Sequence, residues 1–119
     1  MIYHITSVNH WQKALDLGFY QADSLQTEGF IHGSTQAQVS KVANAFYWGQ
    51  KQLIVLEVAP EKLHSCLQWE SPLHPDGGIL TDLEASEKFP HIYGTINLEA
   101  VLRVIPLELE PDGSFIFHP

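Results

Sequence analysis

Three histidines of this chain, His4, His32 and His91, each lie in a short run of strand-forming residues. An imidazole gains and loses a proton near neutral pH, so each could act as a general acid, a general base or a polar contact to a ligand. Tyr93 follows His91 by two residues and would point to the same face of a strand. We predict that these four side chains meet in one cleft. For His4 and Tyr93, a hydrogen-bonded place in the core is an equal alternative.

The stretch Glu-Gly-Phe-Ile-His-Gly-Ser-Thr, which ends at Thr35, predicts a strand that leads directly into a helix. Thr35 and Gln38 have the spacing of a capping box, and apolar residues then repeat at helical spacing as far as Gly49. His32 and Ser34 therefore lie at a junction where backbone N–H groups favour an anionic or strongly polar ligand. The alternative is a polar turn in which His32 bonds only its own loop.

Other residues that could do chemistry give weaker indications. Glu70 follows Trp69, so it is either a carboxylate whose pKa is raised against the indole or a solvated strand end. The sequence contains no His-x-His or His-x-x-x-His pair, and we expect no metal site. Large aromatic residues expected in the core or in subunit contacts are Trp11, Phe46 and Trp48. Histidines expected on the surface without a role are His10, His64, His74 and His118.

Composition narrows the class of protein. The 119 residues are 45% hydrophobic, which suits one domain over residues 1–119 with a core of its own. The formal net charge of -8 and a single arginine, Arg103, argue against a nucleic-acid or anionic-membrane surface. With Cys66 as the sole cysteine, neither an internal disulfide nor a thiolate zinc cluster can form. The sequence shows no signal peptide or spanning segment, so we expect a cytoplasmic protein with a small-molecule ligand; its oligomeric state stays open.

The coarse pattern predicts an α+β domain with about six or seven strands and two main helices. Strands are expected at 2–6, 30–32, 52–58, 67–70, 91–94 and 101–109, and a turn at 111–114 would return 115–117 as a hairpin. One helix should run from the Ser7 cap to Gly18 with Val8, Trp11 and Leu15 on its inner face. Single turns are expected at 60–63 and 98–101. Residues 19–27 and 71–88 are expected to be loops, the second long enough to be a functional cover or disordered.

Several motifs are spread over nearly the whole chain: Ile2-Tyr3-His4-Ile5-Thr6, Ser24-Leu25, the stretch 28–35, Gln38, Trp69-Glu70 and Phe89-Pro90-His91-Ile92-Tyr93-Gly94. In this combination they resemble the domain-of-unknown-function 952 family. That family has no established reaction, so the resemblance settles little about activity.

The order of the pieces also resembles the ADP-ribosyltransferase superfamily. The segment Tyr3-His4-Ile5-Thr6 looks like the Tyr-His-Gly-Thr strand of that superfamily, and residues 29–34 look like its second strand and Ser-rich helix start. The resemblance implies an ADP-ribosyltransferase-like fold with a split, mostly antiparallel sheet. It also implies a cleft that holds NAD while the nicotinamide–ribose bond breaks, with His4 bonding a ribose hydroxyl. An oxocarbenium-like state of this kind is stabilised by carboxylates and fixed dipoles.

The chain departs from this pattern in its charged residues. The superfamily's glutamate position falls near Pro90 or His91, where no carboxylate stands, and Glu70 and Glu28 are the candidates to replace it. One arginine is too few for the phosphates that the RNA 2′-phosphotransferase branch must hold, so we set that branch aside.

The leading expectation is a cleft that binds NAD or a related nucleotide and could transfer from it, with His32 and His91 as catalytic or orienting groups. Side chains expected to bind the ligand are His4, Thr6, Phe30, Ser34, Glu70 and Tyr93. The alternative is a non-catalytic module of the same fold that binds a small metabolite or a protein. The missing arginines and displaced carboxylate favour the alternative, and the histidines favour chemistry.

Overall fold

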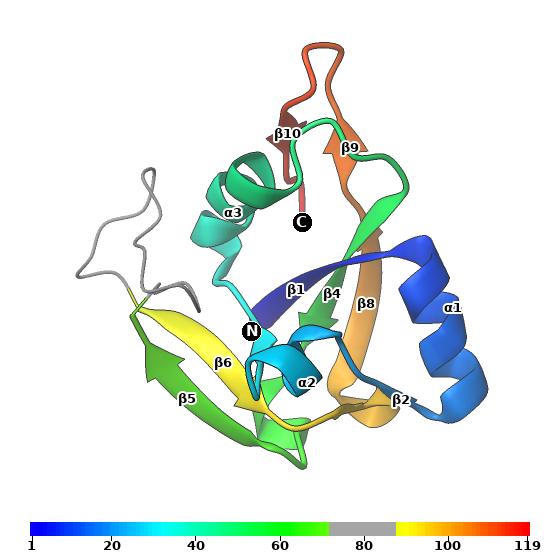
Figure 1. The fold of residues 1–119 in the computed structure, drawn as a ribbon, viewed down its shortest axis with the longest axis vertical. Helices are drawn as coiled ribbons and strands as arrows, with labels where there is room; N and C mark the ends of the chain where they lie inside the picture. Colours follow the sequence, from blue (N-terminus) through cyan, green and yellow to red (C-terminus); the bar gives the residue numbers. More distant parts are fainter. Residues whose placement is uncertain (72–87) are drawn as a thin grey trace.

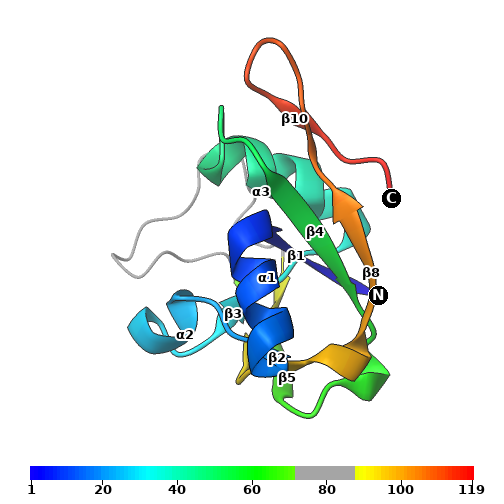
Figure 2. The same cartoon turned by 90° about the vertical axis from the view of Figure 1, so that its right-hand side faces the viewer.

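Two three-stranded antiparallel sheets pack around one shared core (Figures 1 and 2). The computed structural model describes residues 1–71 and 88–119. The first sheet has the strand order β1 (Ile2–Ser7), β4 (Leu53–Val58), β8 (Val101–Pro106). The second has the order β3 (Ile31–His32), β6 (Phe89–Tyr93), β5 (Cys66–Glu70). Two shorter pairs join β2 (Phe19–Tyr20) to β7 (Ile96–Asn97) and β9 (Glu108–Leu109) to β10 (Phe115–Ile116).

Three α-helices and three single turns connect these strands. The helices are α1 (Val8–Leu17), α2 (Ser24–Thr27) and α3 (Val39–Phe46). The 3-10 turns are η1 (Gln36–Gln38), η2 (Pro60–Lys62) and η3 (Leu98–Ala100). The antiparallel sheets with few helices confirm the predicted mixed architecture, but the described residues form ten strands rather than six or seven. The additional strands are two-residue pairings, which are too short to produce a periodic sequence pattern. In the described residues, no helix is long and apolar enough to cross a membrane.

Strand β4 lies at the centre of the first sheet and is buried along its whole length. One face of this sheet packs against α3 and the β9–β10 hairpin through Val39, Ala43 and Phe115. The other face packs against α1 and the second sheet through residues such as Ala14, Ile31 and Ile92. Because both faces are covered, the strand is apolar at nearly every position, as the sequence predicts. His4 lies on β1 between Ile2 and Thr6, which point to the same face of the strand because they are two residues away. This face is the one that packs towards the second sheet.

Helix α1 begins and ends at the predicted residues but presents a different face to the core. The Ser7 side chain accepts a hydrogen bond from the His10 backbone, and Gly18 closes the helix in the left-handed conformation at φ 89°. Ala14 is buried and Trp11 packs partly against the core, whereas Leu15 is 48% exposed. The expected face through Leu15 is therefore wrong. Residues 11 and 14 lie one turn apart and make the contact, while residue 15 is rotated by about 100° from residue 14.

Residues 19–27 are not the loop that the sequence indicates. Tyr20 is a buried member of β2, paired with Ile96, and the short helix α2 follows. Neither element is long enough for its period to repeat, so the sequence shows no periodic pattern for them.

The other expected elements are observed with shifted bounds. The predicted helix after Thr35 starts as the turn η1 and continues as α3, and the capping box between Thr35 and Gln38 is present. The expected strand 101–109 divides at Leu107 into β8 and β9, and β10 returns beside β9 as predicted. Most of the long loop expected at 71–88 lies outside the described residues.

Candidate functional site

The pairing of β3 with β6 places His32 directly opposite His91. Paired residues on adjacent strands point to the same face of a sheet. The two ring centroids are 5.4 Å apart. The predicted convergence of these two histidines is confirmed, although they are 59 positions apart along the chain (91 minus 32).

His91 is held by a carboxylate from the neighbouring strand. Its Nδ1 atom lies 2.9 Å from Oε1 of Glu70, and the Tyr93 hydroxyl donates to the same oxygen at 2.6 Å. A carboxylate only accepts hydrogen bonds, so Nδ1 of His91 carries the proton and Nε2 is the basic nitrogen of the neutral ring. The hydrogen bonds from Tyr93 and His91 lower the pKa of Glu70. Of the two alternatives for Glu70, the raised pKa beside Trp69 is wrong, because Glu70 accepts hydrogen bonds from these donors. Glu70 ends β5 with its side chain 41% exposed, as the alternative of a solvated strand end predicts.

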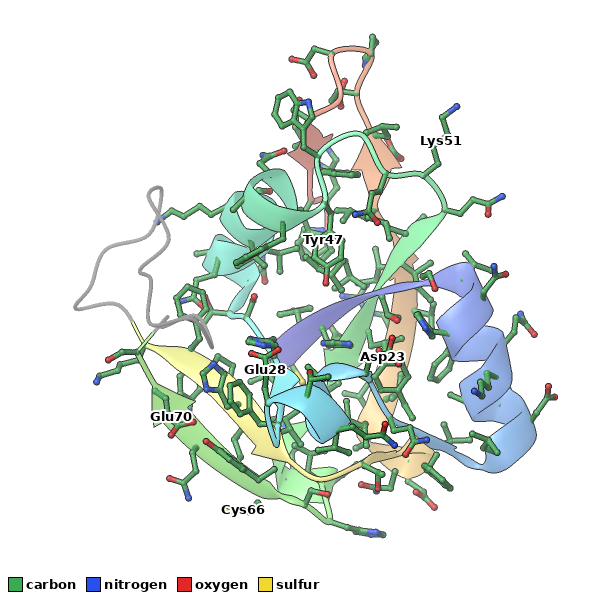
Figure 3. All side chains as sticks on the ribbon, viewed as in Figure 1. Asp23, Glu28, Tyr47, Lys51, Cys66 and Glu70 are labelled. Carbon is green, nitrogen blue, oxygen red and sulfur yellow. The ribbon has the colours of Figure 1, made fainter. Side chains whose placement is uncertain are left out.

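A second carboxylate–histidine pair is formed by His32 of β3 and Glu28, which follows α2. Nε2 of His32 is 3.0 Å from Oε1 of Glu28, the residue that ends helix α2. The Glu28 side chain is only 17% exposed, whereas that of His32 is 46% exposed. Figure 3 shows Glu28 at the centre of the molecule and Glu70 towards the outside of the second sheet. In the first pair the histidine, His91, is the more buried member, and in the second pair it is the carboxylate, Glu28.

Phe30 fixes the relative positions of these rings. It stacks on His91 with a centroid distance of 4.2 Å and an interplanar angle of 20°. Its ring also lies 4.8 Å from that of His32 and 5.4 Å from that of Tyr93. Phe30 thus packs between the groups that the sequence singled out, and its contacts restrict their rotation.

His4 lies beneath this cluster, with both ring nitrogens occupied by protein groups. Nδ1 donates to the carbonyl oxygen of His32 at 2.6 Å, and Nε2 lies 2.7 Å from the Tyr20 hydroxyl. A further hydrogen bond of 2.9 Å joins the hydroxyls of Tyr20 and Thr6. Burial lowers the pKa of His4 to about 4, so the ring is neutral at neutral pH. In this arrangement His4 positions the backbone of His32, and the resemblance-based role of binding a ribose hydroxyl would require one of these bonds to break.

A cleft of about 480 Å³ lies between β1, α2, α3 and the paired histidines. The predicted site residues that line it are His4, Thr6, His32 and His91. The predicted site residues outside its lining are Phe30, Ser34, Glu70 and Tyr93; three of them support the histidines, and the Ser34 backbone pairs with Tyr3. The volume falls within the range of small-molecule sites.

Sequence reasoning missed several residues that line this cleft. Asp23 and Tyr20 come from the segment expected to be a loop, and Phe46 and Tyr47 form an apolar wall at the end of α3. In Figure 3 the labelled Asp23 and Glu28 lie on the α2 side and Tyr47 on the α3 side. The sequence signal that could have found Glu28 and His32 as partners is their spacing of four residues.

His10 also lines the cleft, although the sequence analysis gives it no role. It is exposed on α1, as expected, and its Nδ1 atom lies 2.9 Å from the Ser7 hydroxyl. His10 is therefore unsuitable as an inert control in a test of this site.

Three backbone N–H groups at the strand–helix junction have partners within the protein. The backbone N–H of Gly33 donates to Pro90 and that of Ser34 donates to Tyr3. The N–H of Thr35 donates to the Gln38 side chain within the capping box. Because these three N–H groups bond to protein groups, an anion at the junction cannot be bound by them. The described residues also contain no group of three His, Cys, Asp or Glu side chains that could hold a metal ion.

The structure is similar to that of protein CC0527 from Caulobacter crescentus, a Northeast Structural Genomics Consortium target. Its crystal structure has a TM-score of 0.78 and 30% sequence identity, covering 97% of this chain and 92% of that one. Its solution NMR structure has a TM-score of 0.68 and 28% identity over 95% and 89% of the two chains. No curated protein matches the chain. The family model described as "Protein of unknown function (DUF952)" matches residues 5–104, and the chain therefore belongs to this family.

Proposed function

We propose that this protein is an enzyme of the ADP-ribosyltransferase kind, which breaks the N-glycosidic bond of NAD or a related nucleotide and passes the ribosyl group to an acceptor. The observation that carries the proposal is that Glu28 and His91 line the same cleft. One supplies a carboxylate, and the other supplies an imidazole whose Nδ1 atom is hydrogen bonded to Glu70. The reaction class, cleavage of an N-glycosidic bond, comes from the resemblance of the chain's motifs to those of the ADP-ribosyltransferase superfamily.

Glu28 supplies the negative charge that such a reaction needs. When the bond between C1′ and the base nitrogen breaks, its electron pair leaves with the base and the ribose becomes an oxocarbenium-like cation. A carboxylate beside that cation lowers the barrier. Of the two candidate glutamates, Glu28 lines the cleft, whereas Glu70 lies behind His91. Glu28, at the end of α2, thus takes the role of the glutamate that the superfamily has at the position near Pro90.

His91 completes the reaction as a general base. Its Nδ1–H is bonded to Glu70, which leaves Nε2 to accept the proton of the attacking hydroxyl group or water. The acceptor oxygen then bonds to C1′ and its proton resides on the imidazole until solvent removes it. Glu70 stays ionised and stabilises the imidazolium, as an acidic partner does in other carboxylate–histidine pairs.

A non-catalytic binding module is the second candidate, and His4 is the observation that favours it. The resemblance to the ADP-ribosyltransferase superfamily implies a ligand contact at this position, but here both ring nitrogens bond protein groups. A cleft of this kind could bind a small metabolite without acting on it.

Nicotinamide release separates the two candidates. We expect purified protein to release nicotinamide from a nicotinamide N-riboside donor, and Glu28→Gln to lower kcat by about 100-fold because the carboxylate charge is lost. Glu108→Gln is the matched control, since Glu108 is exposed on β9 and outside the cleft lining. Equal turnover in wild type and Glu28→Gln would contradict the role of Glu28. Binding of donor without any turnover would favour the module.

A further inference from the structure

The charges along the cleft distinguish between the possible donors. The acidic residues that line it are Asp23 and Glu28. All six Lys and Arg residues of the chain lie in the described part, and none of them is among the described residues that line the cleft. The described lining of the cleft therefore carries a net negative charge when its histidines are neutral.

Several groups that could bind phosphate are already bonded to other groups of the protein. Arg103 makes two hydrogen bonds to Glu57, at 2.9 and 2.7 Å, and Lys88 donates to the Ser71 hydroxyl. At the strand–helix junction, the backbone N–H groups of residues 33 to 35 all have protein partners. Phosphate sites are normally built from Arg, Lys or free backbone N–H groups.

The histidines do not reverse this balance. His4 is neutral at neutral pH because it is buried, and its two nitrogens are hydrogen bonded. His32 bonds Glu28 and His91 bonds Glu70, so a proton on either ring is matched by the charge of its own carboxylate. The remaining histidine among the described residues that line the cleft is His10, whose Nδ1 atom lies 2.9 Å from the Ser7 hydroxyl. A pyrophosphate in this cleft would therefore meet more negative charge than positive.

We infer that the donor taken by this cleft is a phosphate-free N-riboside with a cationic base, such as a pyridinium riboside, rather than a nucleotide. This inference rests on the glycosidic reaction of the proposed function and replaces its nucleotide donor with a nucleoside. The pyridinium charge would lie beside Glu28 and Asp23, and the aromatic wall of Phe46 and Tyr47 would cover the flat ring. Hydrolysis balances without a further reactant: the C1′–N bond breaks, its electron pair neutralises the pyridinium, water adds to C1′, and one proton passes through His91 to solvent.

Three donors that differ mainly in phosphate test the inference. Nicotinamide riboside, nicotinamide mononucleotide and NAD share the same glycosidic bond and leaving group. We expect kcat/KM for nicotinamide release from the riboside to exceed that from either phosphorylated donor by at least about tenfold at low salt, with the ratio shrinking as salt rises. Thermal stabilisation by each donor should follow the same order.

A charge reversal provides a matched pair of variants. Asp23→Lys should raise the ratio of mononucleotide to riboside kcat/KM by about tenfold, since it places a cation in the lining. Asp23 is exposed and its side chain makes no cap hydrogen bond to α2, so the fold should tolerate the change. Asp16→Lys makes the same change in net charge on the exposed face of α1, outside the lining, and should leave the ratio unchanged.

The two claims fail in different ways. If NAD or the mononucleotide is cleaved as well as the riboside or better, the inference about the donor is wrong while the glycosidic reaction stands. If none of the three donors is cleaved or stabilises the protein, the proposed function is wrong and the inference falls with it.

Discussion

His4 has the most constrained environment of the histidines described here, and it makes stability depend on pH. Its pKa falls from an ordinary 6.5 to about 4 on burial. Below pH 6.5 the unfolded chain therefore binds a proton that the folded protein does not, so the free energy of unfolding decreases as pH falls towards 4. The loss should reach about 3 kcal/mol across this range, and the contribution is fully present above pH 6.5.

Chemical denaturation between pH 7 and pH 4, with an NMR titration of the histidine rings, checks this prediction. Glu57 and Glu70 also have lowered pKa values, but their contributions are lost below the ordinary glutamate pKa of 4.5 and fall in a separate window. A His4 ring that titrates near pH 6.5 in the folded protein would show that the buried network is not closed as described.

Single residues of the site were predictable where they lie on recognisable strands. His32 and His91 were placed on one face because each belongs to a strand pattern, and the register puts them opposite each other. Tyr20 and Asp23 were missed because their elements contain too few residues to show a period. The hydrogen bonds that occupy His4 come from distant residues, which no local pattern reveals.

At the scale of elements, the capping box of η1 sets where the chain turns from the second sheet towards α3. Thr35 and Gln38 satisfy each other's backbone N–H groups. Thr35→Ala should lower the free energy of unfolding by about 1 kcal/mol. Thr27→Ala is the matched control, because its hydroxyl makes only a 3.4 Å contact at the exposed end of α2. Equal stability of the two variants in urea denaturation would show that the capping box contributes nothing measurable.

Elements with strong local signals were predicted well, and those defined by pairing were not. The buried strand β4 and the caps of α1 follow from apolar runs and from Ser and Gly at the ends. The junction before α3 was located correctly, but its N–H groups bond Pro90 and Tyr3, which lie on strands far along the chain. Tertiary pairing therefore occupies the N–H groups of residues 33 and 34, which no local pattern reveals.

At the scale of the whole molecule, the two sheets act together to form the cleft. The Ser34 backbone pairs with Tyr3 of β1 and so links the end of β3 to the first sheet. In the ribbon, α3 lies above β1 and α2 lies below it (Figure 1). The cleft lining takes its apolar wall from the end of α3 and its acidic residues from the two ends of α2. The net charge of -8 adds to the local preference for a cationic or neutral ligand.

The central claim is that a small glycosylated base occupies this cleft between Glu28 and His91. A crystal of the Glu28→Gln variant, in which turnover should be slow, soaked with nicotinamide riboside tests it directly. We predict that the pyridinium ring packs against Phe46 and Tyr47 and that C1′ lies between residue 28 and Nε2 of His91. A riboside bound elsewhere on the molecule, or a cleft without riboside at saturating concentration, would contradict the account.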